Sequence, residues 1–307
     1  MSRGSLWGRI TRGIRWSWVN PRYRGSVPDN LDDSVMELVA TDRLHVKQGR
    51  STGRVLFSET PGKPPLSVFL KRHYRLPWLL GLAATLRPAG RYSPAAAELA
   101  HLRQTRALGV AVPAVVAVGE QIGPWGRLRS YLMVAELTGC QELHLALPEL
   151  ARILDPAAFA AAKRRIVPEL ARITAALHNA QVFHKDLYLC HFFLDRELLA
   201  RDSEAVRIVL IDLHRLRKHR LGAVRWRWKD LGQLLYSTAG VEGVEDRDLL
   251  RFWMHYRRRT RLRCPRIQAQ LVRLKAGRYQ AHNRAPGRKP VRPAQTPRPT
   301  GGLPGVS

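Results

Sequence analysis

Cysteine is scarce in this sequence. The chain has three cysteines, Cys140, Cys190 and Cys264, and no two of them form a Cys-x-x-Cys pair. An odd number of cysteines without such a pair argues against a disulfide framework or a zinc site. It favours a reducing compartment.

Long apolar runs are also lacking. The best candidate for a membrane span, Trp78 to Leu86, is far shorter than the roughly 18 to 20 apolar residues that a span requires. The first residues include arginines but no apolar signal-peptide core, so the sequence predicts that the chain is not exported. Residues 75–92 are nevertheless too apolar for a solvated loop, and one interpretation is that they contact the acceptor or a membrane.

Negative charge is the third shortage. The chain has 24 acidic residues against 52 lysines and arginines, which gives a formal net charge of +28. No acidic residue precedes Asp29, and none follows Asp248. Such an excess of positive charge implies an anionic partner, namely a phosphate-bearing ligand, a membrane surface or nucleic acid. The alternative is that part of the arginine content reflects genomic base composition.

One polar stretch has the spacing of a kinase active site. The triplet His184-Lys185-Asp186 is followed, five positions after the aspartate, by His191, and an apolar run at 208–211 then ends on Asp212. Protein kinases have the pattern His-Arg-Asp-x-x-x-x-Asn, with a metal-binding aspartate at the end of a later strand. In that pattern Asp186 accepts the proton of an acceptor hydroxyl, while His191 and Asp212 hold Mg²⁺ against the phosphates of ATP.

The residues around these positions resemble a narrower group. His-Lys-Asp-Leu-Tyr-Leu-Cys-His-Phe at 184–192 and Ile-Asp-Leu-His-Arg at 211–215 are similar to the lipopolysaccharide core kinases, the Kdo/WaaP heptose kinase family, which carries histidine in place of the metal-binding asparagine. Other segments match as well: Val68 to Lys71, the segment around Glu98, Leu108 to Val110, Val118 to Glu120, and Arg225 to Leu231. The resemblance covers residues 40 to 260 approximately.

The resemblance implies both a function and a fold. The implied function is that of a kinase that uses ATP and Mg²⁺ to phosphorylate a sugar hydroxyl on a lipid-linked saccharide, a heptose of the lipopolysaccharide inner core. Such a protein is expected in the cytoplasm, peripherally bound to the cytoplasmic face of the inner membrane. The implied fold is α+β and two-lobed, with a small β-rich N-lobe, a larger α-helical C-lobe and a shared cleft.

The expected domains follow from that fold and from composition. Residues 1–33 form a basic, tryptophan-rich N-terminal arm, residues 34–138 the kinase-like N-lobe, and residues 139–280 the helical C-lobe. Residues 281–307 form a basic tail rich in proline and arginine. Such a composition cannot bury a core, so the tail is expected to be disordered, and it could bind anionic headgroups or nucleic acid.

The N-terminal arm has an amphipathic interpretation. Drawn as a helix, it presents one apolar arc, with arginines on the opposite side: Leu6, Trp7, Ile10, Ile14 and Trp18. Such a helix could lie in a membrane interface, although Trp16 would face the charged side. An arm packed on the protein body and a disordered arm are the alternatives.

A lysine–glutamate pair is expected in the N-lobe. Lys71 lies on the strand candidate 66–74 and needs a partner, because an unpaired buried ammonium is costly. In the kinase pattern that partner is a glutamate on the next helix, here Glu98, and the lysine contacts the nucleotide phosphates. Ser93-Pro94 predicts the start of this helix, with serine as the N-cap and proline in the first turn, and Gly109 predicts its end.

Two further nucleotide contacts are expected from position in the fold. Gly49 and Gly53 would form a phosphate-covering turn, because glycine lets backbone N–H groups approach phosphate oxygens. Two glycines four residues apart also describe any hairpin. The backbone carbonyl of Glu136 and the amide of Thr138 would bind adenine, where kinases connect their lobes.

Four residues are expected to complete the catalytic loop. Lys185 replaces the usual arginine and could reach the transferring phosphate, while His184 would support the loop and the turn at Asp212. His191 is either a direct Mg²⁺ ligand or a polar support, because imidazole is a poorer ligand for Mg²⁺ than oxygen. Asp230 opens an apolar helix and would bind the backbone of the loop.

Apolar periodicity and helix-capping residues predict the remaining strands and helices. Residues 34–57 alternate as strands of a small sheet do, and residues 112–118 and 130–135 predict two more strands. Asp155-Pro156 starts a helix whose apolar stripe belongs to the core, and Pro168 either kinks this helix or delays its start. Residues 252–279 predict one or two arginine-rich helices.

Other functions stay open at this point. A kinase of the same superfamily could act on another small molecule or on a protein. A basic nucleic-acid-binding protein on a kinase-like scaffold would fit the charge, but no helix-turn-helix, zinc or aromatic stacking motif supports it. The sequence does not specify an oligomeric state.

Overall fold

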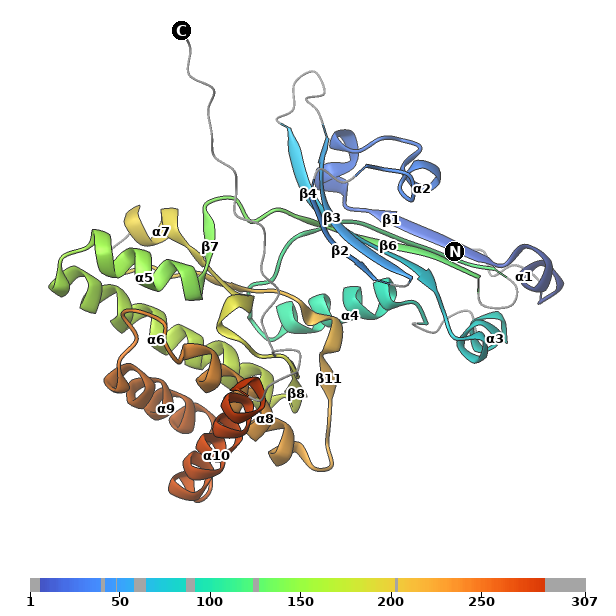
Figure 1. Cartoon of the computed structure of the whole chain (residues 1–307). Coiled ribbons are helices and arrows are strands. Elements are labelled where there is room, and N and C mark those ends of the chain that lie inside the picture. Colours follow the sequence, from blue (N-terminus) through green and yellow to red (C-terminus); the bar gives the residue numbers. More distant parts are fainter. Residues whose placement is uncertain are drawn as a thin grey trace, which may run out of the picture. The chain divides into compact units, whose positions relative to one another are not determined.

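The structure falls into two compact units. The computed structural model describes residues 6–39, 42–47, 49–57, 65–86, 92–123, 127–201 and 204–284. The described residues of the first unit lie within Met1–Leu99 and Ala114–Glu136. Those of the second unit lie within Ala100–Pro113 and Leu137–Val291 (Figure 1).

The first unit is built on a six-stranded antiparallel sheet. The strand order is β1-β5-β6-β4-β3-β2. The strands are β1 Ile14–Val19, β2 Asp42–Lys47, β3 Arg50–Phe57, β4 Leu66–Arg75, β5 Val115–Ile122 and β6 Arg127–Ala135. The predicted β-rich N-lobe and the predicted strand 66–74 are confirmed. β5 begins later than expected, after Pro113, which has no amide hydrogen to donate to a ladder.

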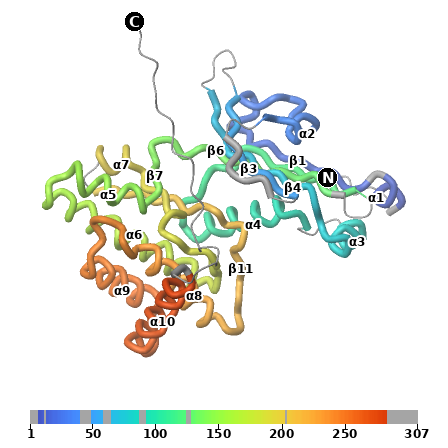
Figure 2. The backbone as a smooth tube through the Cα atoms, in the orientation of Figure 1, coloured from blue at the N-terminus to red at the C-terminus, as the bar shows by residue number. Residues whose placement is uncertain are grey.

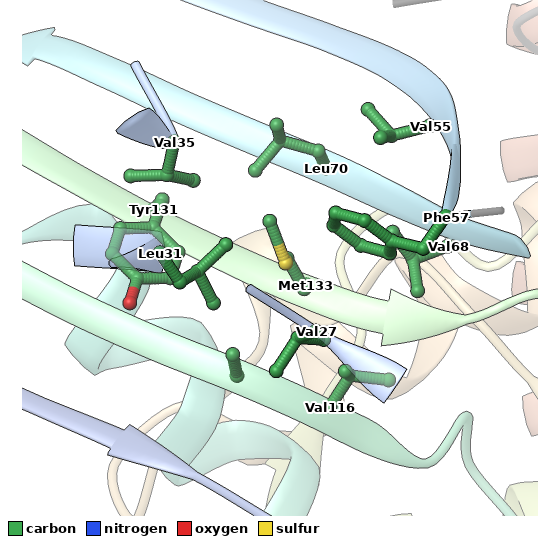
Figure 3. Close-up of a cluster of buried hydrophobic side chains, with 11 residues drawn as sticks. Val27, Leu31, Val35, Val55, Phe57, Val68, Leu70, Val116, Tyr131 and Met133 are labelled. Carbon is green, nitrogen blue, oxygen red and sulfur yellow. The ribbon is translucent and has the colours of Figure 1, made fainter. Parts of the chain in front are cut away.

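Apolar side chains on one face of this sheet form a core cluster. Val68 and Leu70 alternate along β4 and are almost completely buried. They pack with Val27, Leu31 and Val35 from the segment that contains α2 Leu31–Ser34 (Figure 3). Burial of alternate residues fixes the register of a strand. This packing therefore fixes the register of β4, the strand that carries Lys71.

The N-terminal segment is not one amphipathic helix. α1 Leu6–Arg12 ends at Gly13, whose φ of +77° is the left-handed conformation that glycine adopts readily. The chain then enters β1, which pairs with β5 along its whole length. The prediction of a helix that continues through Ile14 to Trp18 is therefore wrong, and the alternative of a packed arm describes β1.

β1 also removes the expected boundary at residue 33 between the N-terminal arm and the N-lobe. The indole of Trp16, which would have faced the charged side of a helix, donates a hydrogen bond to the Glu120 carboxylate at 2.5 Å. Tyr131 on β6 donates to Asp32 at 2.5 Å. These contacts join the first 33 residues to the sheet, so they belong to the same unit as β4 rather than forming a separate arm.

Two helices follow β4 in sequence. They are α3 Trp78–Leu86, within the apolar stretch 75–92, and α4 Pro94–Ala107. The predicted cap of α4 is confirmed, because the Ser93 hydroxyl accepts a hydrogen bond from the amide of Ala96 at 3.1 Å. The predicted end is confirmed as well, since Gly109 has a φ of +72°, typical of a helix C-cap.

The second unit is mainly helical, as the sequence predicted for the C-lobe. Its helices are α5 Leu143–Ile153, α6 Pro156–Asn179, α7 Arg196–Arg201, α8 Ala223–Thr238, α9 Asp246–Thr260 and α10 Pro265–Arg284. The short strands are β7 Cys140–Glu142, β8 Val182–Phe183, β9 Phe192–Asp195, β10 Ile208–Leu210 and β11 Arg217–Lys218. β9 lies between β10 and β7 in one small sheet, and β8 pairs with β11 in another.

α6 is the long helix of this unit and begins as predicted. The Asp155 carboxylate accepts hydrogen bonds from the amides of Ala157 and Ala158 at 2.9 and 3.0 Å. Pro168 lies inside the helix, so the helix does not start late at this residue. α6 delivers the chain through Asn179 to β8, directly before the candidate catalytic loop.

The C-terminal boundary differs slightly from the expected one. α10 continues to Arg284, beyond the expected end of the C-lobe at residue 280. The rest of the basic tail expected to be disordered lies outside the described residues. Within the part of the chain that the structure describes, none of the helices combines the length and apolar character needed to cross a membrane.

Candidate active site

The His184-Lys185-Asp186 triplet follows directly after β8. β8 pairs antiparallel with β11, which holds the start of the loop in place. Lys185 has a φ of +71°, a conformation that is uncommon for a residue with a side chain. This sharp reversal turns the chain between β8 and Asp186, and such strain persists only where surrounding contacts enforce it.

Asp230 supplies those contacts. Its carboxylate is completely buried in the middle of α8, rather than at the expected start of a helix. It accepts hydrogen bonds from the amides of His184 and Lys185, both at 2.8 Å. The ammonium of Lys229 donates to the Lys185 carbonyl at 2.5 Å. The structure thus places Asp230 where the sequence predicted, against the loop backbone.

Two residues of the same helix continue this contact, and neither was predicted from the sequence. The Gln233 side chain accepts a hydrogen bond from the amide of Leu187 at 3.3 Å, and the Ser237 hydroxyl accepts one from the amide of Leu189 at 2.9 Å. Together with Asp230 they form a polar stripe at helical spacing on α8. That stripe was the available signal, and it shows that α8 binds the loop along its length.

His184 supports the turn at Asp212. Its Nε2 donates to the carbonyl of Ile211 at 3.0 Å. The amide of Ile211 donates to the His191 carbonyl, also at 3.0 Å. Both histidines therefore bind the residue that precedes Asp212, and their rings stack with centroids 5.5 Å apart.

His191 is a neutral side chain that faces two aspartates. Its Nδ1 lies 2.7 Å from the backbone carbonyl of Asp186, and a carbonyl can only accept, so Nδ1 carries the proton. Burial, helped by His184, lowers the pKa of His191 from 6.5 to about 4. The unprotonated Nε2 lies 3.9 Å from Oδ2 of Asp212, so His191 presents a lone pair towards that carboxylate near neutral pH.

Asp212 itself sits at a strained position. Its φ of +60° and ψ of +51° are left-handed, and it ends the segment after β10 before a 3₁₀ turn at Leu213–Arg215. Its carboxylate also accepts a hydrogen bond from Nδ1 of His214 at 2.6 Å. Non-glycine residues in this conformation are often found at functional sites.

The donors at Asp212 fit a magnesium ion bound together with substrate. Within the described residues, no group of three or more His, Cys, Asp or Glu side chains is arranged to hold a metal ion. Mg²⁺ in kinase sites is, however, usually held by one or two carboxylates plus substrate phosphates. The partly exposed Asp212 carboxylate suits that mode, with the His191 imidazole as a weaker nitrogen donor beside it.

Asp186 has a partner that was not predicted from the sequence. Nη1 of Arg215 donates to both carboxylate oxygens of Asp186, at 3.0 and 2.7 Å. The Asp186 side chain is 17% exposed and that of Arg215 is 51% exposed. The ion pair holds the carboxylate in one orientation, while Arg215 extends to the surface. Twenty-nine residues separate the two in sequence, and no spacing rule predicts such a contact.

Lys185 is not directed at the carboxylate of Asp186. Its ammonium lies 4.3 Å from the centroid of the Trp226 ring, a cation–π contact. Burial, together with Arg217 and Arg215, lowers its pKa. The predicted contact with a transferring phosphate would therefore require Lys185 to leave the indole. The alternation of tryptophan with basic residues at 225–229 was the signal for this contact.

The first unit contains the expected lysine–glutamate pair. Lys71 lies in the middle of β4, between Thr52 of β3 and Leu132 of β6. Its Nζ is 2.5 Å from Oε1 of Glu98 on α4, and the two side chains are 14% and 5% exposed. A buried pair this close is strongly coupled, because removal of one partner leaves an uncompensated charge.

The two glycines of the expected phosphate-covering turn lie in different elements. Gly49 has a φ of +81° and lies in the turn before β3. Gly53 lies inside β3, where it pairs with Leu70. The two glycines therefore do not share one turn, because β3 begins at Arg50, directly after the first of them.

The expected adenine contacts lie where the chain passes from one unit to the next. The amide of Glu136 donates to the Ser67 carbonyl at 3.0 Å, and its carboxylate pairs with Arg54 at 3.4 Å. Thr138 precedes β7 in the second unit. The contact of Glu136 with Ser67 extends the pairing of β6 with β4, so its backbone orientation follows from the sheet.

These features define a class of protein. An antiparallel sheet with a buried lysine–glutamate pair belongs to one unit, and a helical unit carries a His-x-Asp loop and a second aspartate after a strand. That combination defines an α+β fold of the protein-kinase-like class. The solved structure of WaaP in complex with acyl carrier protein is similar, with a TM-score of 0.63 and 28% identity over 86% of this chain and 98% of that chain.

The particular family follows from the sequence comparison. The chain matches the family described as "Lipopolysaccharide kinase (Kdo/WaaP) family" over residues 84–256, more than half of its length, and it belongs to that family. It is 34% identical over 173 residues to the lipopolysaccharide core heptose(I) kinase WaaP of Pseudomonas aeruginosa, covering 56% of this chain and 62% of that protein.

A second relative matches over a shorter range. The chain is 36% identical over 94 residues to the lipopolysaccharide core heptose(I) kinase WaaP of Escherichia coli K12, covering 31% of this chain and 35% of that protein. The chain therefore aligns with less than two thirds of the length of these curated relatives. The predicted family is confirmed.

Proposed function

We propose that the chain is a kinase that transfers a phosphate from ATP to a heptose hydroxyl of the lipopolysaccharide inner core. The observation that carries this proposal is the fixed loop at 184–191, where Asp230 holds the backbone and His191 faces Asp212. Membership of the lipopolysaccharide kinase family supports the sugar acceptor. We also propose that the enzyme acts at the cytoplasmic face of the inner membrane, where a lipid-linked core saccharide would be its acceptor.

The proposed roles follow the geometry of the loop. Asp186 accepts the proton of the acceptor hydroxyl, and its ion pair with Arg215 keeps the carboxylate oriented. Asp212 holds Mg²⁺, with His191 beside it. The ion, when bound, neutralises charge on the transferring phosphate. Lys71, oriented by Glu98, contacts the nucleotide phosphates.

A transfer assay tests the proposal. Purified protein is incubated with MgATP and a lipid-linked core saccharide whose inner-core heptose is unphosphorylated, and the product is mapped by mass spectrometry. Addition of one phosphate to the heptose is the expected result. The matched control is the same lipid truncated before its heptose, which should gain no phosphate.

Other outcomes of this assay separate the alternatives. Phosphate transfer to proteins or to other small molecules, with none to the heptose, would indicate a different acceptor and contradict the proposal. Salt-dependent binding of DNA by a protein that neither hydrolyses ATP nor transfers phosphate would favour the nucleic-acid interpretation.

The second unit also contains a cavity that could bind part of a partner protein. The cavity has a volume of about 420 Å³, within the range of small-molecule sites, and most of its lining is apolar. Leu147 of α5, Leu170 of α6, Leu234 of α8 and Trp253 of α9 all contribute to it. Because the similar WaaP structure was solved in complex with acyl carrier protein, we propose that this cavity accepts the acyl chain of such a carrier.

Thermal unfolding tests this partner. Acylated carrier protein is expected to raise the melting temperature, whereas the carrier without its acyl chain should have little effect. Ala269→Phe is expected to fill part of the cavity and to remove the difference between the two carriers, since Ala269 lines the cavity. Equal effects of the two carriers on the wild type would contradict the proposal.

A further inference from the structure

The first unit has an exposed apolar surface made by α1 and α3. The two helices lie side by side (Figures 1 and 2), and Nε of Arg9 on α1 donates to the carbonyl of Thr85 near the end of α3 at 2.9 Å. A cation at the C-terminal end of a helix also interacts favourably with the helix dipole. α1 is thereby attached to α3, and the two form one surface.

α3 is oriented with its large side chains outward. Gly81 and Ala84 are buried, and Ala84 packs with Leu76, Ile122 and Leu128. The large apolar residues of the helix are exposed to 41–64%: Trp78, Leu79, Leu80, Leu82 and Leu86. A helix that only covered a core would turn its leucines inward, so this orientation indicates a second apolar environment on the outer side.

α1 extends the same apolar surface. Trp7 is 74% exposed and Ile10 is 45% exposed. The surface of α1 and α3 thus has a tryptophan near the beginning of each helix, Trp7 and Trp78, with leucine and isoleucine between them. Tryptophan is the side chain that prefers the boundary between hydrocarbon and headgroups in a bilayer.

The charge around this surface is mainly positive. Residues 1–28, 60–97 and 121–135, which include α1, α3 and the strand ends that lead to them, contain no Asp or Glu. The described basic residues of these strand ends include Arg75 and Arg129, both exposed. Two acidic side chains lie near this end of the sheet. Glu120 is buried and bonded to Trp16, and Asp33 is exposed but paired with Arg15 at 2.7 Å. An apolar surface with an excess of positive charge around it is complementary to an anionic bilayer.

We propose that α1 and α3 form a docking surface for an anionic lipid bilayer, with Trp7, Trp78, Leu79 and Leu82 entering the headgroup boundary. A second copy of the chain is a poorer occupant, because a symmetric contact would place the same arginines against each other. The inference stands on this surface alone and does not rest on the sugar-kinase activity. It replaces the expected docking helix of residues 6–18, since Ile14 and Trp18 belong to β1.

Vesicle flotation with matched variants tests the surface. The full-length protein is mixed with phosphatidylcholine vesicles, with and without phosphatidylglycerol, at low and high ionic strength. The wild type should bind the anionic vesicles, and less at high salt, because salt screens the arginines. Leu79→Ser/Leu82→Ser should lower the partition coefficient by about tenfold or more, since both leucines lose their burial in lipid.

The control replaces equally exposed residues of the second unit. Ile267→Ser/Leu274→Ser changes two apolar residues of α10 that are 57% and 65% exposed, and it should bind as the wild type does. Circular dichroism of both double variants should match the wild type, because none of the four residues is buried. Quenching by lipids brominated on their acyl chains adds an independent readout, which should decrease in Trp78→Phe.

Two results would overturn the inference. If Leu79→Ser/Leu82→Ser binds anionic vesicles as tightly as the wild type does, attachment occurs elsewhere, for example through the basic tail. If the same variant loses self-association in sedimentation experiments while its vesicle binding is unchanged, the surface is an interface between copies.

Discussion

Replacement of Asp186 by asparagine is expected to lower phosphate transfer to the acceptor by about 10²- to 10⁴-fold, the usual contribution of a general base. The amide oxygen of asparagine can still accept a hydrogen bond from Arg215, but the amide cannot accept a proton from a hydroxyl. The loop backbone is held by Asp230 through other atoms, the amides of His184 and Lys185. The variant should therefore fold and bind MgATP normally.

Separate measurements of turnover and nucleotide binding check this expectation. The rate is measured with the lipid-linked acceptor, and MgATP affinity is measured by titration calorimetry. Glu242→Gln, which makes the same carboxylate-to-amide change on an exposed turn of the second unit, serves as the control and should leave both quantities unchanged. Near-full turnover in Asp186→Asn would remove Asp186 from the reaction.

The three aspartates of the site have distinct surroundings, and these suggest a division of labour. Asp230 is fully buried and bonded to backbone amides, so it is positioned to fix the loop. Asp186 is paired with an arginine side chain that extends to the surface, where an acceptor could approach. Asp212 lies beside His191 and His214 and keeps partial exposure, which suits a carboxylate that receives a metal ion together with its substrate.

Local features of the fold could be predicted from the sequence because their causes are local. The serine and aspartate caps at Ser93 and Asp155 accept hydrogen bonds from amides two or three residues away. The spacing from Asp186 to His191 also lies within one loop, so the contact of the His191 ring with the Asp186 carbonyl is a short-range one. A motif of fixed spacing can specify such geometry without knowledge of the rest of the chain.

Long-range pairings could not be predicted in this way. β1 pairs with a strand about one hundred residues later, as the 104-residue separation of Trp16 and Glu120 shows. Six alternating residues are compatible with a strand or a short helix, and only the partner edge of β5 decides between them. Gly13 was the local signal against a long helix, since glycine favours the left-handed conformation that ends one.

The same limit applies to the site. The contacts of Asp186 with Arg215, of Lys185 with Trp226 and of the loop amides with Gln233 join segments that the fold brings together. The polar stripe on α8 and the alternation of tryptophan with basic residues at 225–229 mark some of these residues, but the sequence alone does not show which segment each of them contacts. The orientation of α3 is a further case, because the same apolar residues could have faced a core.

Replacement of Asp212 by asparagine is expected to have an effect of similar size through a different step. An asparagine has a neutral oxygen in place of the carboxylate, so it should bind Mg²⁺ much more weakly. Since a bound metal ion contributes several kcal/mol to charge stabilisation and each 1.36 kcal/mol is a factor of ten, turnover should fall by roughly 10³-fold. Unlike Asp186→Asn, this variant should also lose the Mg²⁺-dependent part of its affinity for ATP.

Nucleotide titrations in the presence and absence of Mg²⁺ distinguish the two aspartates. Chelation of Mg²⁺ should weaken ATP binding in the wild type and in Asp186→Asn. In Asp212→Asn, chelation should change the affinity for ATP little. Asp195→Asn is the matched control. Asp195 ends β9, which neighbours β10, the strand before Asp212. This variant should retain the wild-type response to Mg²⁺. If Asp212→Asn keeps the full Mg²⁺ dependence, the ion is held by other residues, and the contact of His191 with Asp212 serves only to support the turn.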